Sequence, residues 1–234
     1  MVESAEARQA LFDALENIAT RMESEREYLT ELDSAIGDAD HGTNMNRGFQ
    51  TVLDEVDGME DEPLDEVVKT VGMALVSEVG GAAGPLYGGS IVHASQELSD
   101  GLTGESAVAF AEAYLEKVTD RGGASVGAKT MVDALTPAVH TFKKSIEQDD
   151  LPPVEALAKA LDAAERGVAF TTPIRAQKGR ASYLGWRSVG HQDPGATSTL
   201  FIVEELVATA REYAGGDTTA DATAPAPPDD DEGE

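Results

Sequence analysis

The chain of 234 residues contains no cysteine and is poor in basic and aromatic side chains. The absence of cysteine excludes disulfides, thiolate metal ligands and a cysteine nucleophile, so any metal site must use oxygen or imidazole ligands. Lys and Arg number 17 against 44 Asp and Glu, which gives a formal net charge of −27. Because such a surface repels nucleic acid and anionic membranes, we expect neither as a partner.

The sequence also lacks a long apolar run at its start, where MVESAEARQALFDAL mixes acidic and polar residues with apolar ones. This pattern is typical neither of a secretory signal nor of a membrane span, so we expect a cytoplasmic protein. The acidic excess further predicts a halophilic, salt-rich cytoplasm. Like charges repel over roughly 30 Å at 0.01 M salt, but over only about 3 Å at 1 M salt.

Apolar residues recur at helical spacing along most of the chain, and no convincing alternating strand is present. The spacing predicts eight helices and therefore an all-α bundle. The expected helices cover residues 11–32, 44–59, 64–79, 87–98, 105–119, 131–146, 153–168 and 193–210. A longer loop is expected between residues 171 and 192, before a helix that Asp193 can cap and Pro194 can begin.

Composition divides the chain into two parts. Residues 1–214 carry the helical pattern and are long enough for one well-packed domain. Residues 215–234 are rich in Gly, Thr, Ala and Pro and end in the acidic run DDDEGE. This segment cannot bury enough apolar surface to order itself, and we expect a disordered acidic tail.

The most informative stretch is LDSAIGDADHGTNMNRGF, residues 32–49, which contains Asp33, Asp38 and Asp40. Gly37 lets the backbone bend, so that the three carboxylates can share one cation. Hard carboxylate oxygens suit Mg²⁺, which takes its remaining ligands from water and from nucleotide phosphates. In a chain this acidic, the alternative is that Asp33 caps a helix or is solvated and that the other two form a turn.

The residues that follow the acids favour a phosphate site. His41, Gly42, Thr43 and Asn44 present an imidazole, a hydroxyl, an amide and free backbone N–H groups at the start of a predicted helix. Helix N-termini bind phosphate through such groups. His41 directly follows the carboxylates and must lie near them.

Two further loops contain groups that could contact phosphate. GGAAGPLYGG, residues 80–89, offers unobstructed backbone amides, but it has no Walker A lysine, follows no predicted strand and could equally allow close helix packing. The segment KGRASYLGWRSVGHQDPGATS places Lys178 and Arg180 before another helix start. Arg180 suits an anionic group or a base, although a surface ion pair is the ordinary role of a single arginine, and the simplest role for Trp186 is to anchor the loop.

Four motifs, in the same order, resemble the DhaL subunits of dihydroxyacetone kinases. They are GDADHGTNMNRGF, GGAAGPLYGG, GAKTMVDAL, and GRASYLG followed by GHQDPGATS. The resemblance covers residues 11–213. It implies a barrel of eight antiparallel helices, in agreement with the number of helices expected from the periodicity.

The resemblance also implies a nucleotide site at one end of the barrel. Asp33, Asp38 and Asp40 would hold two Mg²⁺ ions that bridge the phosphates of ADP or ATP. The residues implied to bind the nucleotide are His41, Gly42, Thr43 and Asn44 after the acids, Gly81, Ala82 and Ala83 on the phosphate side, Gly127 and Met131 near the nucleoside, and Arg180, Asp193, Pro194 and Gly195, which close the site. Many relatives have Ser at the position of Ala83, and this chain lacks that hydroxyl contact to phosphate. Backbone amides or water must therefore contact the phosphate in its place.

The family divides its reaction among subunits. A DhaK subunit holds dihydroxyacetone covalently on a histidine, and in phosphotransferase-dependent members a DhaM phosphohistidine, supplied from phosphoenolpyruvate, rephosphorylates the bound ADP. By resemblance, this chain would supply metal and the γ-phosphoryl group, with no nucleophile or base of its own. The resemblance leaves a homodimer open.

Two alternatives to this function remain at the level of sequence. The chain could serve a kinase that exchanges ATP freely and acts on dihydroxyacetone or, as in related kinases, on a fatty acid. It could also be a nucleotide-loaded regulatory module that binds a transcription factor.

Overall fold

The computed structural model describes residues 5–214, and this part of the chain is entirely helical, without a strand. No helix within it is long and apolar enough to cross a membrane. The elements are α1 (Ala5–Ser24), α2 (Arg26–Ile36), α3 (His41–Val56), α4 (Leu64–Glu78), α5 (Ala83–Ala94), η1 (Ser95–Leu98), α6 (Gly104–Gly122), α7 (Val132–Glu147), α8 (Pro153–Thr171), η2 (Arg180–Ser188) and α9 (Pro194–Ala214). The expected tail, residues 215–234, lies outside the described residues.

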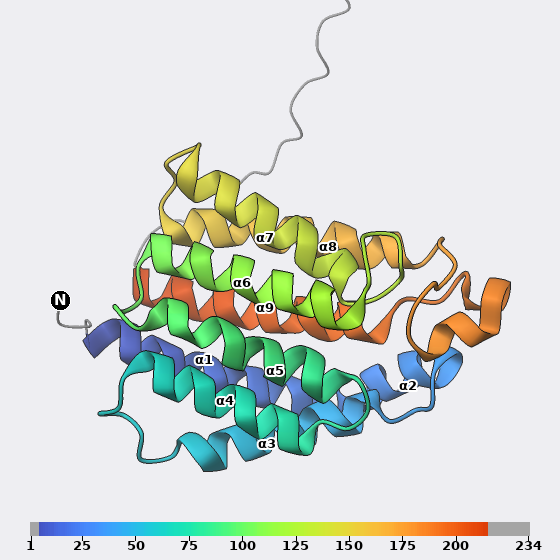
Figure 1. Cartoon of the computed structure of the whole chain (residues 1–234), viewed down its shortest axis with the longest axis horizontal. Coiled ribbons are helices and arrows are strands. Elements are labelled where there is room, and N and C mark those ends of the chain that lie inside the picture. The colour runs from blue at the N-terminus through green and yellow to red at the C-terminus, as the bar shows by residue number, and fades with distance from the viewer. Residues whose placement is uncertain (1–4, 215–234) are drawn as a thin grey trace, which may run out of the picture.

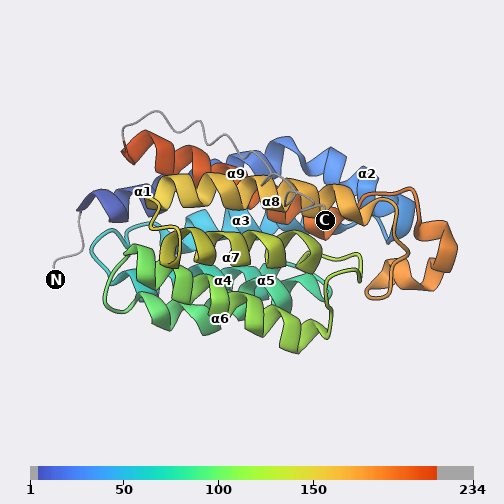
Figure 2. The same cartoon turned by 90° about the horizontal axis from the view of Figure 1, so that it is seen from above.

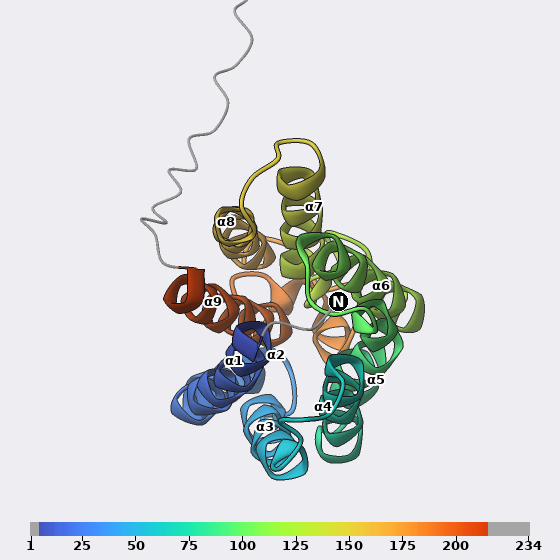
Figure 3. The ribbon, with the colours of Figure 1, turned by 90° about the vertical axis from the view of Figure 1, so that its left-hand side faces the viewer.

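The helices close into a barrel. Contacts run from α1 to α3 and then from each helix to the next as far as α9, which packs against α1 again. The view along the bundle shows this ring, with α2 lying next to α1 (Figure 3). Neighbouring helices run in opposite directions, so the loops gather at the two ends of the barrel (Figure 1). The expected eight-helix barrel is confirmed, with α2 as an additional segment.

The barrel is held by an apolar interior to which most helices contribute. Met22, Met45, Leu75 and Val118 come from four different helices and are less than 2% exposed. Burying one such side chain stabilises the fold by about 1.5–3 kcal/mol. A second cluster between α7, α8 and α9 is built mainly from alanines, which let these three helices pack closely.

The expected first helix, 11–32, is divided in two. The hydrogen bonds from Glu25 N to Arg21 O and from Leu29 N to Glu25 O persist, at 3.0 and 2.9 Å. Glu25 itself has φ −96° and ψ 5°, outside the ideal helical range, and the direction of the chain changes there. Apolar periodicity continues across this point, which is why the sequence pattern did not reveal it.

The loop expected between residue 80 and a helix start near Tyr87 is also shorter than predicted, because α5 begins at Ala83. Gly84 and Gly88 lie inside this helix, where a Cβ would come within 2.3 Å of the Val79 carbonyl oxygen and 2.4 Å of the Gly72 carbonyl oxygen, respectively. These glycines therefore allow α4 and α5 to pack closely, as the alternative interpretation of the motif held. Only residues 80–83 remain free to line a site.

The connection between α8 and α9 extends beyond the barrel. It projects past the end of α8, beside the end of α2, in both side views (Figures 1 and 2). A loop was expected here, but residues 180–188 form the 3-10 helix η2. The end of the barrel that carries this segment also carries the acidic turn between α2 and α3.

Candidate functional site: an acidic turn facing three helix N-termini

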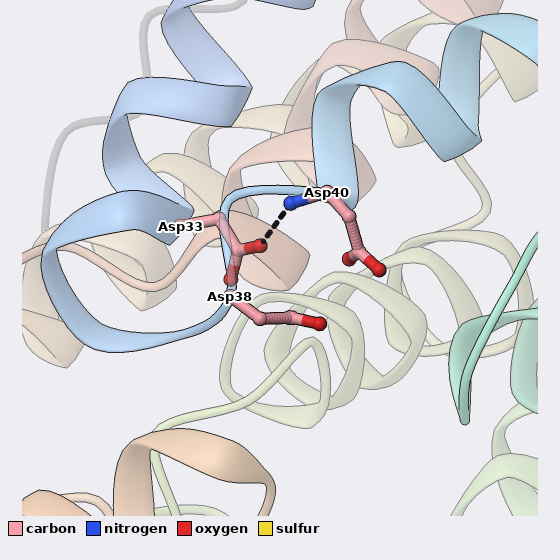
Figure 4. A group of neighbouring side chains, drawn as sticks. All are labelled: Asp33, Asp38 and Asp40. Atoms are coloured by element: carbon pink, nitrogen blue, oxygen red, sulfur yellow. Dashed lines mark hydrogen bonds between the residues drawn. The ribbon is translucent and has the colours of Figure 1, made fainter.

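The three aspartates of the acidic turn lie together. Asp33 is in the last turn of α2, and Asp38 and Asp40 follow in the connection to α3 (Figure 4). One carboxylate oxygen from each residue lies within 4.8 Å of the others. The arrangement consists only of oxygen donors, which is the donor set that Mg²⁺ prefers.

Asp33 is buried, and its two carboxylate oxygens have different surroundings. Its Oδ2 accepts hydrogen bonds from the backbone N–H groups of Asp40 and His41, at 2.9 and 3.2 Å, and so caps the start of α3. Its Oδ1 faces Gly37, where an added Cβ would lie 1.9 Å away. The glycine is therefore required for space beside this carboxylate. Ala39 adopts a left-handed φ of 62°, an unusual conformation for a residue with a side chain.

The N-termini of three helices meet at the cleft beside the acids. These are α3, which begins at His41, α5, which begins at Ala83, and α9, which begins at Pro194. Each helix start carries a partial positive charge of about half a unit. Asp33 caps the first N–H group of α3 and Asp193 caps Ala196 N of α9, and the other N–H groups of each first turn have no partner within their own helix. Together they favour an anionic ligand, which the carboxylates alone would repel.

The cleft has a volume of about 210 Å³. Its walls come from all the loops at this end of the barrel: Asp33, Ile36, Gly37, Asp38, Asp40, His41, Asn44, Gly80, Gly81, Ala82, Ala83, Leu86, Tyr87, Lys129, Thr130, Met131, Lys178, Gly179, Arg180, Ala181, Asp193, Pro194 and Gly195. It combines a carboxylate side that suits a cation with helix N-termini and cationic side chains that suit an anion. A larger cavity of about 570 Å³ between α6 and α7 contains none of the predicted site residues.

Arg180 connects the projecting segment to the acidic turn. Its guanidinium forms an ion pair with Asp38, and its Nη1 lies 3.8 Å from the Asp40 carboxylate. Asp38 and Asp40 therefore both interact with the Arg180 guanidinium. The side chain of Arg180 remains about half exposed and faces the cleft mouth.

His41 is held by a buried hydrogen-bond network. Its Nε2 lies 2.9 Å from the Ser198 hydroxyl, which in turn lies 2.9 Å from the Tyr87 hydroxyl. Tyr87 also donates to the Gly195 carbonyl at 2.8 Å. Burial lowers the pKa of His41, against the opposing effect of Asp33. Burial likewise raises the pKa of Tyr87 to about 12, so the phenol stays protonated.

Lys129 lies beneath the cleft and is only 1% exposed. Its ammonium donates to the backbone carbonyls of Thr171 at 2.8 Å, Ser188 at 2.7 Å and Ile174 at 3.3 Å, and also to the His191 carbonyl. All four carbonyls belong to the end of α8 or to the connection from α8 to α9. Lys129 therefore fixes the segment that carries Arg180.

Two buried carboxylates accompany this lysine. Asp133 accepts from the backbone N–H groups of Gly127 at 2.5 Å and Thr130 at 2.8 Å. Asp193 caps α9, as the sequence predicted, by accepting from Ala196 N at 2.7 Å. Burial raises the pKa of Asp193 to about 7, with Asp133 adding to the rise and Lys129 opposing it.

The structure brings most of the predicted site residues to the cleft, with three exceptions. Gly42 is buried against α2, where a Cβ would lie 2.1 Å from the Arg26 carbonyl, so it serves packing. Thr43 is exposed and points away from the cleft lining. Gly127 has φ 91° and supports the loop around Asp133 without lining the cleft.

Several lining residues were not expected from the sequence as site residues. Lys129 and Thr130 lie within GAKTMVDAL, a motif that was recognised without a role for them. Lys178 was expected only as part of a cationic segment near phosphate. Tyr87 was expected only as a helix start. No local pattern marks Lys129 as buried, because its carbonyl partners belong to a distant segment. By contrast, Trp186 does not anchor its loop, since 77% of it is exposed.

Comparison with known proteins agrees with this geometry. Residues 35–208 match the family model described as the DAK2 domain. The ADP-binding DhaL subunit of the phosphoenolpyruvate-dependent dihydroxyacetone kinase of Escherichia coli is 45% identical over 191 residues, which cover 81% of this chain and 90% of that subunit. A DhaL subunit from Listeria innocua is 38% identical over 83% of this chain and 93% of its own length.

Longer kinases contain a similar region. The L-erythrulose 1-kinase of Mycolicibacterium smegmatis is 32% identical over 84% of this chain, which spans 34% of that enzyme. The solved dihydroxyacetone kinase of C. freundii superposes with a TM-score of 0.65 at 23% identity, over 86% of this chain and 34% of the kinase. That likeness concerns the fold. The chain belongs to the DAK2 domain family and, within it, to the DhaL subunits of dihydroxyacetone kinases.

Proposed function

We propose that this chain binds ADP and ATP with Mg²⁺ and passes the γ-phosphoryl group to dihydroxyacetone held on a separate DhaK-like subunit. The observation that carries the proposal is the cleft in which Asp33, Asp38 and Asp40 face the N-termini of three helices. One wall suits a hard cation and the other suits polyphosphate, so the cleft is complementary to a metal–nucleotide complex. The names of the DhaL relatives support the same ligand.

The acidic turn fits magnesium. Three carboxylates with oxygens within 4.8 Å provide enough ligands for two ions, if water and phosphate oxygens complete the coordination. The space that Gly37 leaves beside Asp33 Oδ1 keeps one carboxylate oxygen accessible, while Oδ2 is committed to the α3 cap. When bound, Mg²⁺ neutralises phosphate charge and favours in-line attack on the γ-phosphorus.

The chain's own residues bind and orient the nucleotide. Asn44 lies in the first turn of α3, where its amide can donate to phosphate oxygens beside the carboxylates. His41 lies next to it in the cleft, with its Nε2 paired to Ser198. Gly81, Ala82 and Ala83 bring the backbone of the α5 N-terminus to the same phosphates. Since Ala83 has no hydroxyl, the amides of this helix start are the donors on that side.

The nucleoside would lie on the other wall of the cleft. Met131 is mostly buried and offers an apolar contact for a base, and Pro194 and Gly195 begin α9 next to it. A Cβ on Gly195 would lie 3.2 Å from Asp193 Oδ1, so the absence of a side chain leaves space beside this carboxylate. Arg180 closes the mouth with its guanidinium over the acidic turn.

Catalysis by such a site requires positioning and charge neutralisation, with no protein nucleophile. Arg180 supplies a positive charge next to the carboxylates, where it can stabilise negative charge that develops on a transferred phosphoryl group. The hydrogen-bond network of His41, Ser198 and Tyr87 holds the imidazole in one orientation. Such preorganisation is worth several kcal/mol in phosphoryl transfer.

We further propose that ADP stays bound between turnovers and is rephosphorylated by a DhaM-like phosphohistidine donor. The relatives named as phosphoenolpyruvate-dependent DhaL subunits support this version. A chain that instead exchanges ATP freely would lose its nucleotide during gel filtration and would use ATP directly. A regulatory module would bind the nucleotide but transfer no phosphate.

Reconstitution separates these functions. The purified chain is mixed with a DhaK-like subunit, dihydroxyacetone and either ATP or a phosphohistidine donor regenerated from phosphoenolpyruvate. We expect dihydroxyacetone phosphate to form with the phosphohistidine donor while catalytic amounts of ADP remain on the chain. Formation with ATP alone at the same rate supports the exchanging kinase, and no product under either condition contradicts the proposed function.

A further inference from the structure

The connection between α8 and α9 differs in charge from the rest of the molecule. We name residues 172–192 the basic arm. No Asp or Glu occurs between Glu165 and Asp193, although acidic residues outnumber basic ones 44 to 17 in the whole chain. The arm carries Arg175, Lys178, Arg180 and Arg187.

The basic arm has an ordered framework. The Lys129 ammonium binds carbonyls on both sides of η2, and Ala176 N donates to the Ser188 hydroxyl at 2.9 Å. Ile36, at the end of α2, packs against Ala176 and Ala181 in a small apolar cluster. The arm is therefore attached to the acidic turn, and side chains on its outer face are displayed from a fixed backbone.

Two aromatic side chains of the arm are highly exposed. Tyr183 is 88% exposed and Trp186, the single tryptophan of the chain, is 77% exposed. The Arg175 guanidinium lies 5.3 Å from the Trp186 ring centroid, within range of a cation–π contact. Arg187, next to Trp186, is also exposed. None of these four side chains lines the nucleotide cleft.

Trp, Tyr and Arg are the residue types enriched at the energetic centres of protein interfaces. Here all three occur on one fixed segment that projects from the barrel (Figures 1 and 2). The same segment reaches the mouth of the cleft, since Lys178, Gly179 and Arg180 line it. A protein that brings an acceptor to the cleft must therefore come close to Tyr183 and Trp186.

We infer that Tyr183 and Trp186, with Arg175 and Arg187 around them, form the docking surface for the acceptor-carrying subunit. The inference rests on the proposed function, which places dihydroxyacetone on another chain. Because the arm is cationic and the rest of the surface is acidic, the complementary patch on the partner carries carboxylates and a hollow for the aromatic rings. Charge repulsion elsewhere then directs that partner to this end of the barrel.

The test measures binding between the full chain, loaded with ADP and Mg²⁺, and the purified DhaK-like subunit carrying dihydroxyacetone. Trp186→Ala and Tyr183→Ala should each raise the dissociation constant roughly 30-fold, which is the effect of losing an interface hot spot. Arg187→Glu should also raise the dissociation constant, and the increase should be larger at low salt. Since these side chains do not line the cleft, ADP affinity should remain that of the wild type.

Two control variants remove similar groups elsewhere. Met73 on α4 is 58% exposed, and Arg211 is in the last turn of α9, at the opposite end of the barrel. Met73→Ala and Arg211→Glu should bind the acceptor subunit like the wild type. In phosphoryl transfer, the arm variants should raise the KM for the acceptor subunit and leave kcat at saturation unchanged.

The outcomes separate this inference from the function on which it rests. If the wild type transfers phosphate but the arm variants bind the acceptor subunit normally, the docking surface is wrong and the proposed function stands. The same conclusion follows if the arm variants lose affinity only for the phosphohistidine donor. If the wild type neither binds the acceptor subunit nor transfers phosphate, the proposed function itself is contradicted.

Discussion

Replacement of Lys129 by methionine tests whether a buried ammonium holds the basic arm against the barrel. Methionine preserves most of the side-chain volume and removes the charge. It leaves the carbonyls of Thr171, Ser188 and His191 without their donor, and Asp133 and Asp193 without a nearby cation. Because Lys129 is 1% exposed, water cannot readily replace the lost hydrogen bonds.

The expected magnitude follows from these contacts. Hydrogen bonds from a charged donor contribute about 1.5–3 kcal/mol each. The ammonium has three N–H groups for its four acceptors, so the gross loss is about 4.5–9 kcal/mol. Removing the ammonium also removes the cost of its burial, which opposes part of that loss. Breaking a buried charge network by deleting one member typically costs about 3–5 kcal/mol, and we expect Lys129→Met to destabilise the protein by that amount.

Urea unfolding monitored by circular dichroism measures the change directly. Lys143→Met is the matched control, because Lys143 forms an exposed ion pair with Glu112 and should unfold at nearly the wild-type midpoint. Nucleotide affinity should fall in Lys129→Met even under conditions where the variant is folded, since the arm carries Arg180. A free energy of unfolding within about 1 kcal/mol of the wild type would refute the role assigned to Lys129.

Three further predictions concern the acidic turn, the α9 cap and the surface charge. In Gly37→Ala the new Cβ would lie 1.9 Å from Asp33 Oδ1, so Mg²⁺-dependent ADP binding, measured by calorimetry, should be lost. The control variant Gly104→Ala should bind ADP normally, because its Cβ would meet no atom closer than 3.7 Å. The pKa of Asp193 rises from 3.8 to about 7 in the folded state, which therefore binds more protons than the unfolded chain between those pH values. The stability that this proton contributes is complete below about pH 4 and is lost as pH rises toward 7, by up to about 1.4 kcal/mol per pH unit. Asp193→Asn keeps an oxygen acceptor for the α9 cap but cannot titrate. The variant's free energy of unfolding in urea should therefore depend less on pH in this range. An unchanged profile would count against a buried protonated carboxyl. With a net charge of −27, the melting temperature should rise as KCl is increased, and a melting temperature independent of KCl would contradict the expected salt adaptation.

The helices were predictable because their apolar faces repeat at a regular spacing, which identified the barrel positions of residues such as Val52, Leu75 and Val118. Ends of helices were less accessible. The start of α9 was correct because Asp193 and Pro194 are strong local signals, whereas the division at Glu25 depends on a small change of backbone angle that leaves the apolar pattern intact. The start of α5 was missed because glycines usually interrupt helices, and here close packing against α4 outweighs that tendency.

The site was predictable where chemistry is concentrated in a short stretch. Asp33, Asp38 and Asp40 are close in sequence and therefore close in space. The convergence of three helix N-termini was not predictable from local patterns, because the helices begin at His41, Ala83 and Pro194 and these starts meet only when the barrel closes. Lys129 was overlooked for the same reason, since its four carbonyl partners come from a distant segment.

The central claim is that the acidic turn binds the nucleotide through a metal, and Asp38→Asn tests it most directly. Asp38 is exposed, and its carboxylate accepts none of the backbone hydrogen bonds of the turn, which go to Asp33. Asparagine keeps a side-chain oxygen that can accept from Arg180, so the variant should fold normally. ADP binding is measured by calorimetry for the wild type and the variant, each with Mg²⁺ and with a chelator. We predict that the wild type binds ADP tightly only with Mg²⁺ and that Asp38→Asn binds it no better with Mg²⁺ than without. Wild-type affinity in the variant, or tight binding by the wild type in the presence of the chelator, would contradict the account.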